Sequence, residues 1–250
     1  MSTLTDRLIL MWSNPVTKAN CKIGLLSKKQ TGYQFRYLKD EVRSAYDDGF
    51  TNLAGFPDLE AMYQSPKLFS VFERRIPSSS RKEFKEVINR FQLTEFDDLD
   101  WEYLRVSKGK LATDRLFFLE PIKIQKNVIH LEFEAAGWKP LNQEQNLIDK
   151  VTRGQQLDLL VEPDNPVDPK AIQLMTRGNP PLRIGYVPKP YNEAIHFWIQ
   201  MNIAFHVEIR ALLDEKQCFR PVVSLTGTLP TDRNLKNFLP PVDEFIQESN

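Results

Sequence analysis

The chain has 250 residues, of which 41% are apolar and 11% aromatic, enough to bury a sizeable core and to exclude a largely disordered protein. Basic and acidic side chains balance at 33 each, so no overall positive charge points to nucleic acid, although a local basic patch remains compatible with it. Two cysteines and three histidines without ligand spacing exclude a disulfide framework and a zinc site, and we expect no metal and no cofactor. No segment approaches the roughly 20 apolar residues that cross a bilayer, so a cytoplasmic protein without membrane contact is expected.

The front of the chain predicts three strands followed by helices. Tyr33, Phe35 and Tyr37 alternate with polar residues, as in a half-buried strand. A short helix is expected to end at Gly49, and later apolar residues recur at helical spacing. The strands are expected at 7–12, 22–27 and 33–38, and the later helices at 58–76, 78–91 and 96–109.

Beyond an extended connector at 118–128, the pattern changes to short strands separated by Pro, Gly and Asn, which is typical of a small barrel or sandwich. One amphipathic helix is expected at 190–202. We therefore predict an α+β protein with a small N-terminal β-sheet with helices and a C-terminal β-barrel with one helix. The predicted divisions are 1–125, 126–230 and a loosely held tail at 231–250.

Catalytic signatures are absent from the sequence. It contains neither of the familiar Gly-rich phosphate loops and no GxSxG motif. The carboxylates of Asp97, Asp98 and Asp100 fit a solvated helix start better than an acid–base pair. We expect a protein that is not an enzyme, and an enzyme whose site the sequence hides is the least favoured alternative.

The segment EPDNPVDPKAI at 162–172 combines prolines with carboxylates and one amide. Its prolines fix φ, while Asp164 and Asn165 are suited to folding back onto nearby backbone amides. On chemistry alone, a turn-building role is favoured about three to one over ligand binding.

This segment resembles the signature of the HIRAN domain, roughly EPxNPxDxxAI followed by a strand with G-x-[ILV]. The second part is similar to IGYVP at 184–188, and FEAAGW at 133–138 is similar to the opening strand of the family. The resemblance covers roughly 129–228. It implies an OB-like β-barrel with one helix and, by analogy with eukaryotic fork-remodelling ATPases, capture of the 3′ end of single-stranded DNA.

The resemblance also implies which residues would bind. Asp168 matches the aspartate that contacts the terminal 3′-hydroxyl, whereas Val167 stands where those DNA binders have an aromatic residue. Trp138 and Tyr186 are candidates for base stacking or, equally, for core packing. The predicted nucleic-acid-binding residues are Trp138, Lys139, Asp168, Lys170, Arg183, Tyr186 and Lys189. Asp168→Ala is expected to weaken end capture with little change in the melting temperature.

The front half resembles the N-terminal region of bacterial HipA-type kinases through LILMW, KIGLLS, YQFRY and SPKLFSVFERRIP, in that order. In split systems a small protein of this type restrains its toxin kinase, and the ATP-binding segments are absent here. The predicted partner-binding residues are Phe72, Arg74, Arg75 and Trp101, with core packing favoured for Phe72.

Two functions remain as hypotheses. The first is a nucleic-acid-binding protein whose barrel engages single-stranded DNA ends while the front domain docks a protein partner. The second is an antitoxin-like module that binds and restrains a HipA-type toxin kinase.

Overall fold

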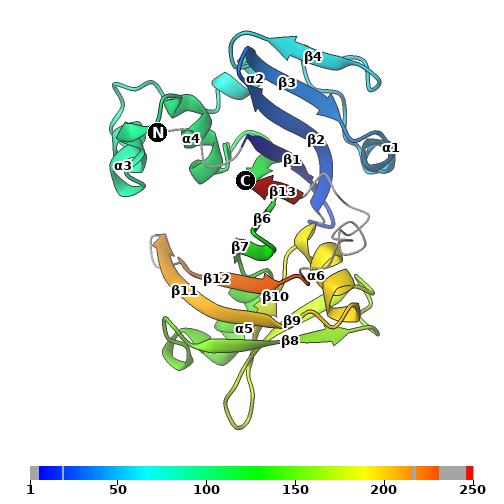
Figure 1. Cartoon of the computed structure of the whole chain (residues 1–250), viewed down its shortest axis with the longest axis vertical. Coiled ribbons are helices and arrows are strands. Elements are labelled where there is room, and N and C mark those ends of the chain that lie inside the picture. Colours follow the sequence, from blue (N-terminus) through cyan, green and yellow to red (C-terminus); the bar gives the residue numbers. More distant parts are fainter. Residues whose placement is uncertain (1–5, 19, 216–217, 231–245, 250) are drawn as a thin grey trace. The chain divides into compact units, whose positions relative to one another are not determined.

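The computed structural model describes residues 6–18, 20–215, 218–230 and 246–249. The chain divides into two compact units, Met1–Pro121 and Ile122–Asn250. This division places 122–125 in the second unit, whereas the sequence predicts them in the first. Within the described ranges the fold is mixed α+β, with two sheets and six α-helices (Figure 1).

The first unit contains an antiparallel sheet of order β4-β3-β2-β1-β5. Its strands are β1 (Arg7–Ser13), β2 (Asn20–Lys29), β3 (Gly32–Tyr37), β4 (Met62–Ser65) and β5 (Leu116–Leu119). The helices of this unit are α1 (Lys39–Asp47), α2 (Ser70–Glu73), α3 (Lys82–Arg90) and α4 (Leu99–Ser107), with a 3-10 turn η1 (Leu93–Glu95). The three predicted strands and the helices at α1, α3 and α4 are confirmed.

The prediction of a helix over 58–76 is wrong for most of its length. Residues 62–65 form the edge strand β4, in which Tyr63 lies opposite Phe35 of β3, and only 70–73 are helical. Burial in β4 alternates between exposed and half-buried side chains, which is the period of a strand. The open edge of β3 offers backbone partners that a helix over these residues would leave unused.

An aromatic cluster forms the core of the first unit. The ring of Phe72 is fully buried among the rings of Phe35, Phe56, Phe69 and Phe118. Such ring contacts add to the stabilisation that comes from area burial. Phe72 is therefore a core residue.

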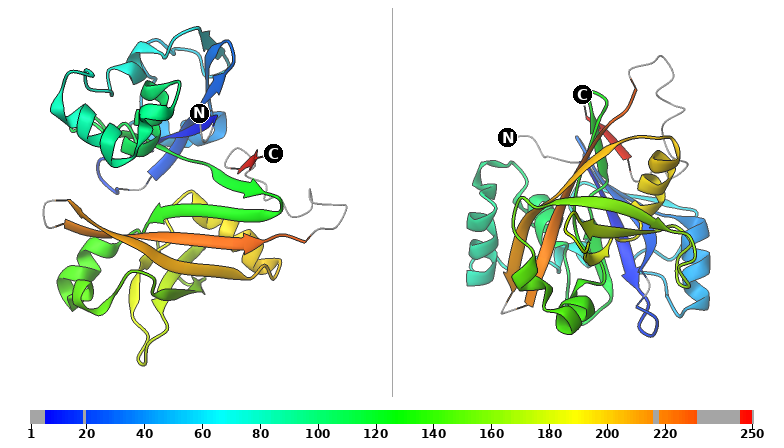
Figure 2. Two further views of the ribbon diagram at one scale, coloured as in Figure 1. Left: turned by 60° about the vertical axis from the view of Figure 1, so that its left-hand side comes forward. Right: turned by 90° about the horizontal axis from the view of Figure 1, so that it is seen from below.

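The second unit contains a sheet of order β10-β9-β8-β11-β12-β7-β6-β13, antiparallel except for the β13–β6 pair. Its strands are β6 (Ile122–Gln125), β7 (Val128–Glu134), β8 (Gln156–Glu162), β9 (Ala171–Thr176), β10 (Arg183–Tyr186), β11 (Phe205–Glu215), β12 (Cys218–Thr228) and β13 (Ile246–Ser249). Its helices are α5 (Trp138–Gln145) and α6 (Tyr191–Gln200), with a 3-10 turn η2 (Leu147–Lys150). The long β11–β12 hairpin curves through the middle of this sheet (Figure 2).

The edge strand β10 of the second unit's sheet makes one backbone bridge to the segment that follows β7. Beyond the end of β7, Ala136 forms an isolated bridge with Tyr186 of β10, through N–H···O bonds of 2.9 and 2.8 Å. One bridge does not make a strand pair, so the described residues form no closed barrel and the predicted OB-like barrel is not confirmed. Two further features differ from the prediction. Helix α5 was not predicted, and 246–249 form β13 rather than part of a loose tail. The rest of that predicted tail, 231–245, lies outside the described residues.

Candidate nucleic-acid interface

The loop that joins β8 to β9 is built by the side chain of Asn165. Glu162 and Ala171 form the last pair of the two strands. Between them, Asn165 Oδ1 accepts hydrogen bonds from the backbone N–H groups of Val167 (3.0 Å) and Asp168 (3.1 Å). Its Nδ2 donates to Glu162 Oε2 at 2.8 Å. This is the back-folding that a turn-forming asparagine provides, so Asn165 has an architectural role.

Asp168 lies at the centre of a polar cluster. Its Oδ1 accepts the backbone N–H of Lys170 at 2.9 Å. Its Oδ2 accepts Asn192 Nδ2 at 2.8 Å and lies 3.3 Å from Lys189 Nζ. The side chain of Asp168 remains 15% exposed, so solvent reaches the carboxylate. The structure thus brings three of the predicted residues together, namely Asp168, Lys170 and Lys189.

Asn192, which sequence reasoning missed, fixes the position of this carboxylate from α6. Its side chain is buried, and Nδ2 also donates to the carbonyl oxygen of Lys170 at 3.2 Å. Two acceptors on one side identify that atom as the amide nitrogen. An asparagine in the first turn of a predicted helix gives no sign of contact with a loop more than twenty residues earlier, so no local sequence signal could have identified it.

These contacts change the expectation for Asp168→Ala. Removing the carboxylate takes an acceptor from the buried Asn192 amide and from the Lys170 backbone N–H. An unsatisfied buried donor costs about 1–3 kcal/mol. We therefore expect Asp168→Ala to lower the melting temperature.

Tyr186 and Arg183 form a second group beside the loop. Arg183 Nη1 donates to the Tyr186 hydroxyl oxygen at 2.8 Å, and the guanidinium carbon lies 5.1 Å from the ring centroid. Burial, followed by a hydrogen bond with Glu162, raises the pKa of Tyr186. Hydrogen bonds from Asn165 and then from Gln173 lower the pKa of Glu162. Because the Arg183 guanidinium lies over the ring of Tyr186, a cation occupies one face of that ring, as in a cation–π pair.

The backbone at Gly185 holds Tyr186 against the end of β7. Gly185 has φ of +150°, and a Cβ atom there would lie 2.6 Å from the carbonyl oxygen of Ala136. Such a contact is too close for any side chain, so glycine permits the bridge between Ala136 and Tyr186. The chain then turns at Gly137, in the left-handed region with φ of +72°, into α5.

The structure disagrees with base stacking by Trp138. This indole starts α5 but is only 3% exposed, so it is packed in the core and presents no face to a base. Its neighbour Lys139 is exposed on α5. Sequence reasoning could not distinguish the two roles, because a tryptophan after a turn glycine fits either one.

The predicted partner-binding residues of the first unit are mostly inaccessible. Phe72 and Trp101 are fully buried, and Arg75 is 4% exposed, so none of them offers a contact surface. Arg75 donates from Nη1 to the carbonyl oxygen of Gly109 at 2.8 Å and forms an ion pair with Asp114. Only Arg74 is exposed.

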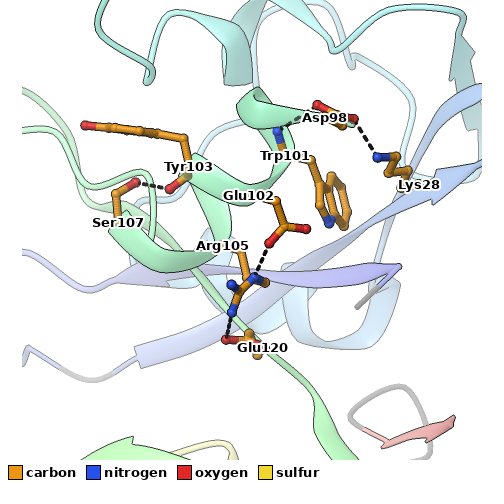
Figure 3. A network of polar contacts seen from close by, with 8 residues as sticks. All are labelled: Lys28, Asp98, Trp101, Glu102, Tyr103, Arg105, Ser107 and Glu120. Carbon is orange, nitrogen blue, oxygen red and sulfur yellow. Dashed lines mark hydrogen bonds and ion pairs between the residues drawn. The ribbon is translucent and has the colours of Figure 1, made fainter. Parts of the chain in front are cut away.

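Trp101 belongs to a network that fixes α4 (Figure 3). Its backbone N–H donates to Asp98 Oδ1 at 3.0 Å, and Asp98 Oδ2 lies 2.9 Å from Lys28 Nζ on β2. One turn later, Arg105 donates to Glu102 at 2.7 Å and to Glu120 at 3.0 Å. Asp98 caps the helix and anchors it to the sheet, so these residues are structural.

Two further observations concern metals and membranes. Within the described ranges, no three His, Cys, Asp or Glu side chains gather as a metal site would require. In the same part of the chain, no helix is both long enough and apolar enough to cross a membrane.

Comparison with known proteins gives weak structural likenesses alone. No protein-family model and no curated protein matches the sequence. Among solved structures, the HIRAN domain of human HLTF is similar with a TM-score of 0.30 at 14% identity, over 39% of this chain and 74% of that one. A protein from Lactobacillus plantarum has a TM-score of 0.33 at 16% identity, over 40% of this chain and 96% of its own. At these TM-scores the likenesses leave the family of the chain open.

Proposed function

We propose that the polar cluster around Asp168 binds the end of a single nucleic-acid strand without catalysing a reaction. In this proposal the carboxylate accepts a hydrogen bond from the terminal 3′-hydroxyl, and neighbouring cations contact phosphate. The observation that carries the proposal is the position of Asp168, which is held by buried Asn192 and by Lys189 and is still reached by solvent.

The carboxylate has room for one more donor. An ionised carboxylate offers about four lone-pair directions. The Lys170 N–H, Asn192 Nδ2 and Lys189 Nζ use three of these. These contacts hold the carboxylate in place before a ligand binds. Binding of a hydroxyl donor would therefore cost little further conformational freedom.

Lys189 beside this acceptor, Lys170 in the same loop and Arg183 next to Tyr186 could contact phosphate. Lys170 and Lys189 are exposed, and Arg183 is half-buried beside Tyr186. Lys189 already lies near Asp168, so a phosphate would compete with the carboxylate for it. Because few cations are involved and the chain has no net charge, we expect modest affinity that falls as salt rises.

Base stacking would rest on Tyr186 and Arg183, because Trp138 is buried. Arginine guanidinium planes and tyrosine rings both accept stacked bases. Val167 is 84% exposed at the loop tip and offers a base only a small apolar contact. This limits the affinity further.

The three segments that resemble HIRAN motifs meet at Tyr186, which supports the proposal. Ala136, from the first segment, pairs with Tyr186 of the third, and Tyr186 hydrogen-bonds to Glu162 of the second. Motifs far apart in sequence that converge on one residue are expected of a binding site. We accordingly propose that the second unit is an OB-like, HIRAN-type module.

Docking of a protein by the first unit is the less supported part of the proposal, because Arg74 is the one exposed residue among the four predicted anchors. No observation in the described residues favours the alternative of restraining a HipA-type kinase.

The test is fluorescence anisotropy with short single-stranded DNA carrying either a free 3′-hydroxyl or a 3′-phosphate, over a series of salt concentrations. We expect tighter binding of the free end and a loss of this preference in Asp168→Ala. The matched control is Asp164→Ala, an exposed aspartate of the same loop. Equal binding of both strands, or an equal effect of the two variants, would contradict the proposal.

A further inference from the structure

A groove in the first unit has the size and the lining of a small-molecule site. Its volume is about 530 Å³, and all its lining residues belong to the first unit. Ligand pockets are usually about 300–1,000 Å³ and mostly apolar, with a few polar groups. The groove belongs to the first unit and the Asp168 cluster to the second, and the proposed function does not use the groove.

The apolar part of the groove comes from the core. Trp12 at the end of β1, Phe50 and Leu53 after α1, and Val71 of α2 line it. These side chains are at most 8% exposed and belong to the packed aromatic cluster, so the floor is rigid. Only small parts of these four side chains reach the groove, and exposed Ala54 and half-buried Leu111 supply further apolar surface.

The polar part of the groove is cationic. Arg74 and Arg115 are exposed and pair with no carboxylate in the parts of the chain that the structure describes. The third arginine, Arg75, is neutralised by its ion pair with Asp114, which also lines the groove. Two guanidinium groups in the lining of the groove therefore have no carboxylate partner among the described residues.

This charge selects the kind of anion. A phosphate monoester carries about 1.5 to 2 negative charges at neutral pH, which matches the two uncompensated guanidinium groups. Arginine also recognises phosphate through paired N–H donors. A carboxylate would neutralise only one of the two arginines. Arg75 Nε, in the same lining, is a buried N–H donor without an acceptor among the described atoms.

We propose that this groove binds a small phosphate monoester with an aromatic or other apolar body. The body lies against Ala54, Leu111 and the accessible edges of the four buried apolar side chains, and the phosphate contacts Arg74 and Arg115. Binding in the first unit would give the chain a second ligand, independent of nucleic-acid binding by the second unit.

The experiment is isothermal titration calorimetry of the full chain with three probes: phenyl phosphate, inorganic phosphate and phenol. We expect phenyl phosphate to bind at least about tenfold more tightly than either fragment, because only it uses both parts of the groove. The double variant Arg74→Gln/Arg115→Gln should lower its affinity about tenfold or more, since it removes two charge-assisted contacts. Arg81→Gln, an exposed arginine outside the groove, should leave the affinity unchanged.

A second variant keeps the test independent of charge. Ala54 is exposed and lines the groove, so Ala54→Phe should fill part of it and weaken phenyl phosphate while folding normally by circular dichroism. Equal binding of phenyl phosphate and inorganic phosphate, no binding at all, or no effect of the double variant would overturn the proposal. Much tighter binding of a phosphotyrosine peptide than of phenyl phosphate would assign the groove to a protein partner and would also overturn it.

Discussion

The α4 network of the first unit and the β8–β9 loop of the second unit use the same chemical groups for different ends. Around α4, Glu102 is fully buried and pairs with Arg105, whose side chain is 10% exposed (Figure 3). In the loop, Asp168 pairs with Lys189, and these side chains are 15% and 45% exposed. A pair that is closed to solvent can only hold the fold together, whereas a pair open to solvent has a lone-pair direction and a cation left for a ligand. These two pairs are alike in residue type, one acidic and one basic side chain each, and differ in the exposure of both partners.

Asp98 and Asp100, at the start of α4, have opposite pKa shifts. Burial would raise the pKa of Asp98, but hydrogen bonds from Tyr33, the Trp101 backbone and Lys28 outweigh it and lower the pKa. Burial, followed by repulsion from Asp98, raises the pKa of Asp100. Hydrogen bonds therefore favour the ionised form of Asp98, and the charge of Asp98 disfavours ionisation of Asp100.

The largest effect is expected from Arg105→Ala in the α4 network. The substitution takes away the guanidinium that pairs with buried Glu102, and breaking a buried ion pair costs about 3–5 kcal/mol. Urea unfolding followed by tryptophan fluorescence measures the loss. The control is Arg43→Ala, which removes an exposed arginine with two long ion pairs and should cost less than about 1 kcal/mol. Similar losses for both variants would mean that the α4 network is not closed to solvent.

An intermediate effect on stability is expected from Asp168→Ala. Loss of one of the two acceptors of Asn192 Nδ2, together with the acceptor of the Lys170 backbone N–H, should lower the free energy of unfolding by about 1–3 kcal/mol. Asp164→Ala, in the same loop, should change it by less than about 0.5 kcal/mol. Denaturant unfolding of the two variants measures the difference. A fully stable Asp168→Ala protein would show that the loop is held without this carboxylate.

Val167→Phe should make the Asp168 cluster a better binder of single-stranded DNA, while the α4 network stays structural. An aromatic ring at this exposed position adds a stacking surface worth about 1–3 kcal/mol per base, so affinity for single-stranded DNA should rise about tenfold. Val16→Phe is the matched control, because Val16 is also 84% exposed but lies in the first unit. Anisotropy titrations should show a gain for Val167→Phe alone, and equal gains would indicate non-specific stacking.

The smallest effect is a pH dependence at Glu162. Its pKa is lowered in the folded protein, so its contribution to stability is present above the unfolded pKa and is lost as pH falls through the folded pKa. The difference in unfolding free energy between the wild type and Glu162→Gln should therefore shrink on acidification below about pH 4.5. Unfolding curves recorded between neutral and acidic pH measure this difference, and a constant difference would argue against the shift.

Secondary structure was largely predictable, since most strands and helices follow local apolar periodicity. The β4 strand was not, because its pairing with β3 overrides the helical spacing of its neighbours. The α5 helix begins at a left-handed glycine without any side-chain cap, so its start carries no sequence signal.

The candidate site was predictable only in part. The prolines, carboxylates and amide of the segment 162–172 mark it as a candidate site in the sequence. Asp168, Lys170 and Lys189 do come together there. Burial of Trp138 and Trp101 depends on packing between distant elements, which local sequence does not encode. The contribution of Asn192 depends on the position of α6 against the loop, and it could not be read from either segment alone.

The close backbone approach at Gly185 has a consequence for how this surface can change over evolution. Because main-chain atoms of Ala136 and Tyr186 hold residue 186 in place, its position depends little on its own side chain. A lineage could exchange the tyrosine for another residue and alter what the surface recognises, while the scaffold keeps its geometry. Gly185 itself has no such freedom, so neighbouring positions carry opposite constraints: one is fixed and the other is open to adaptation.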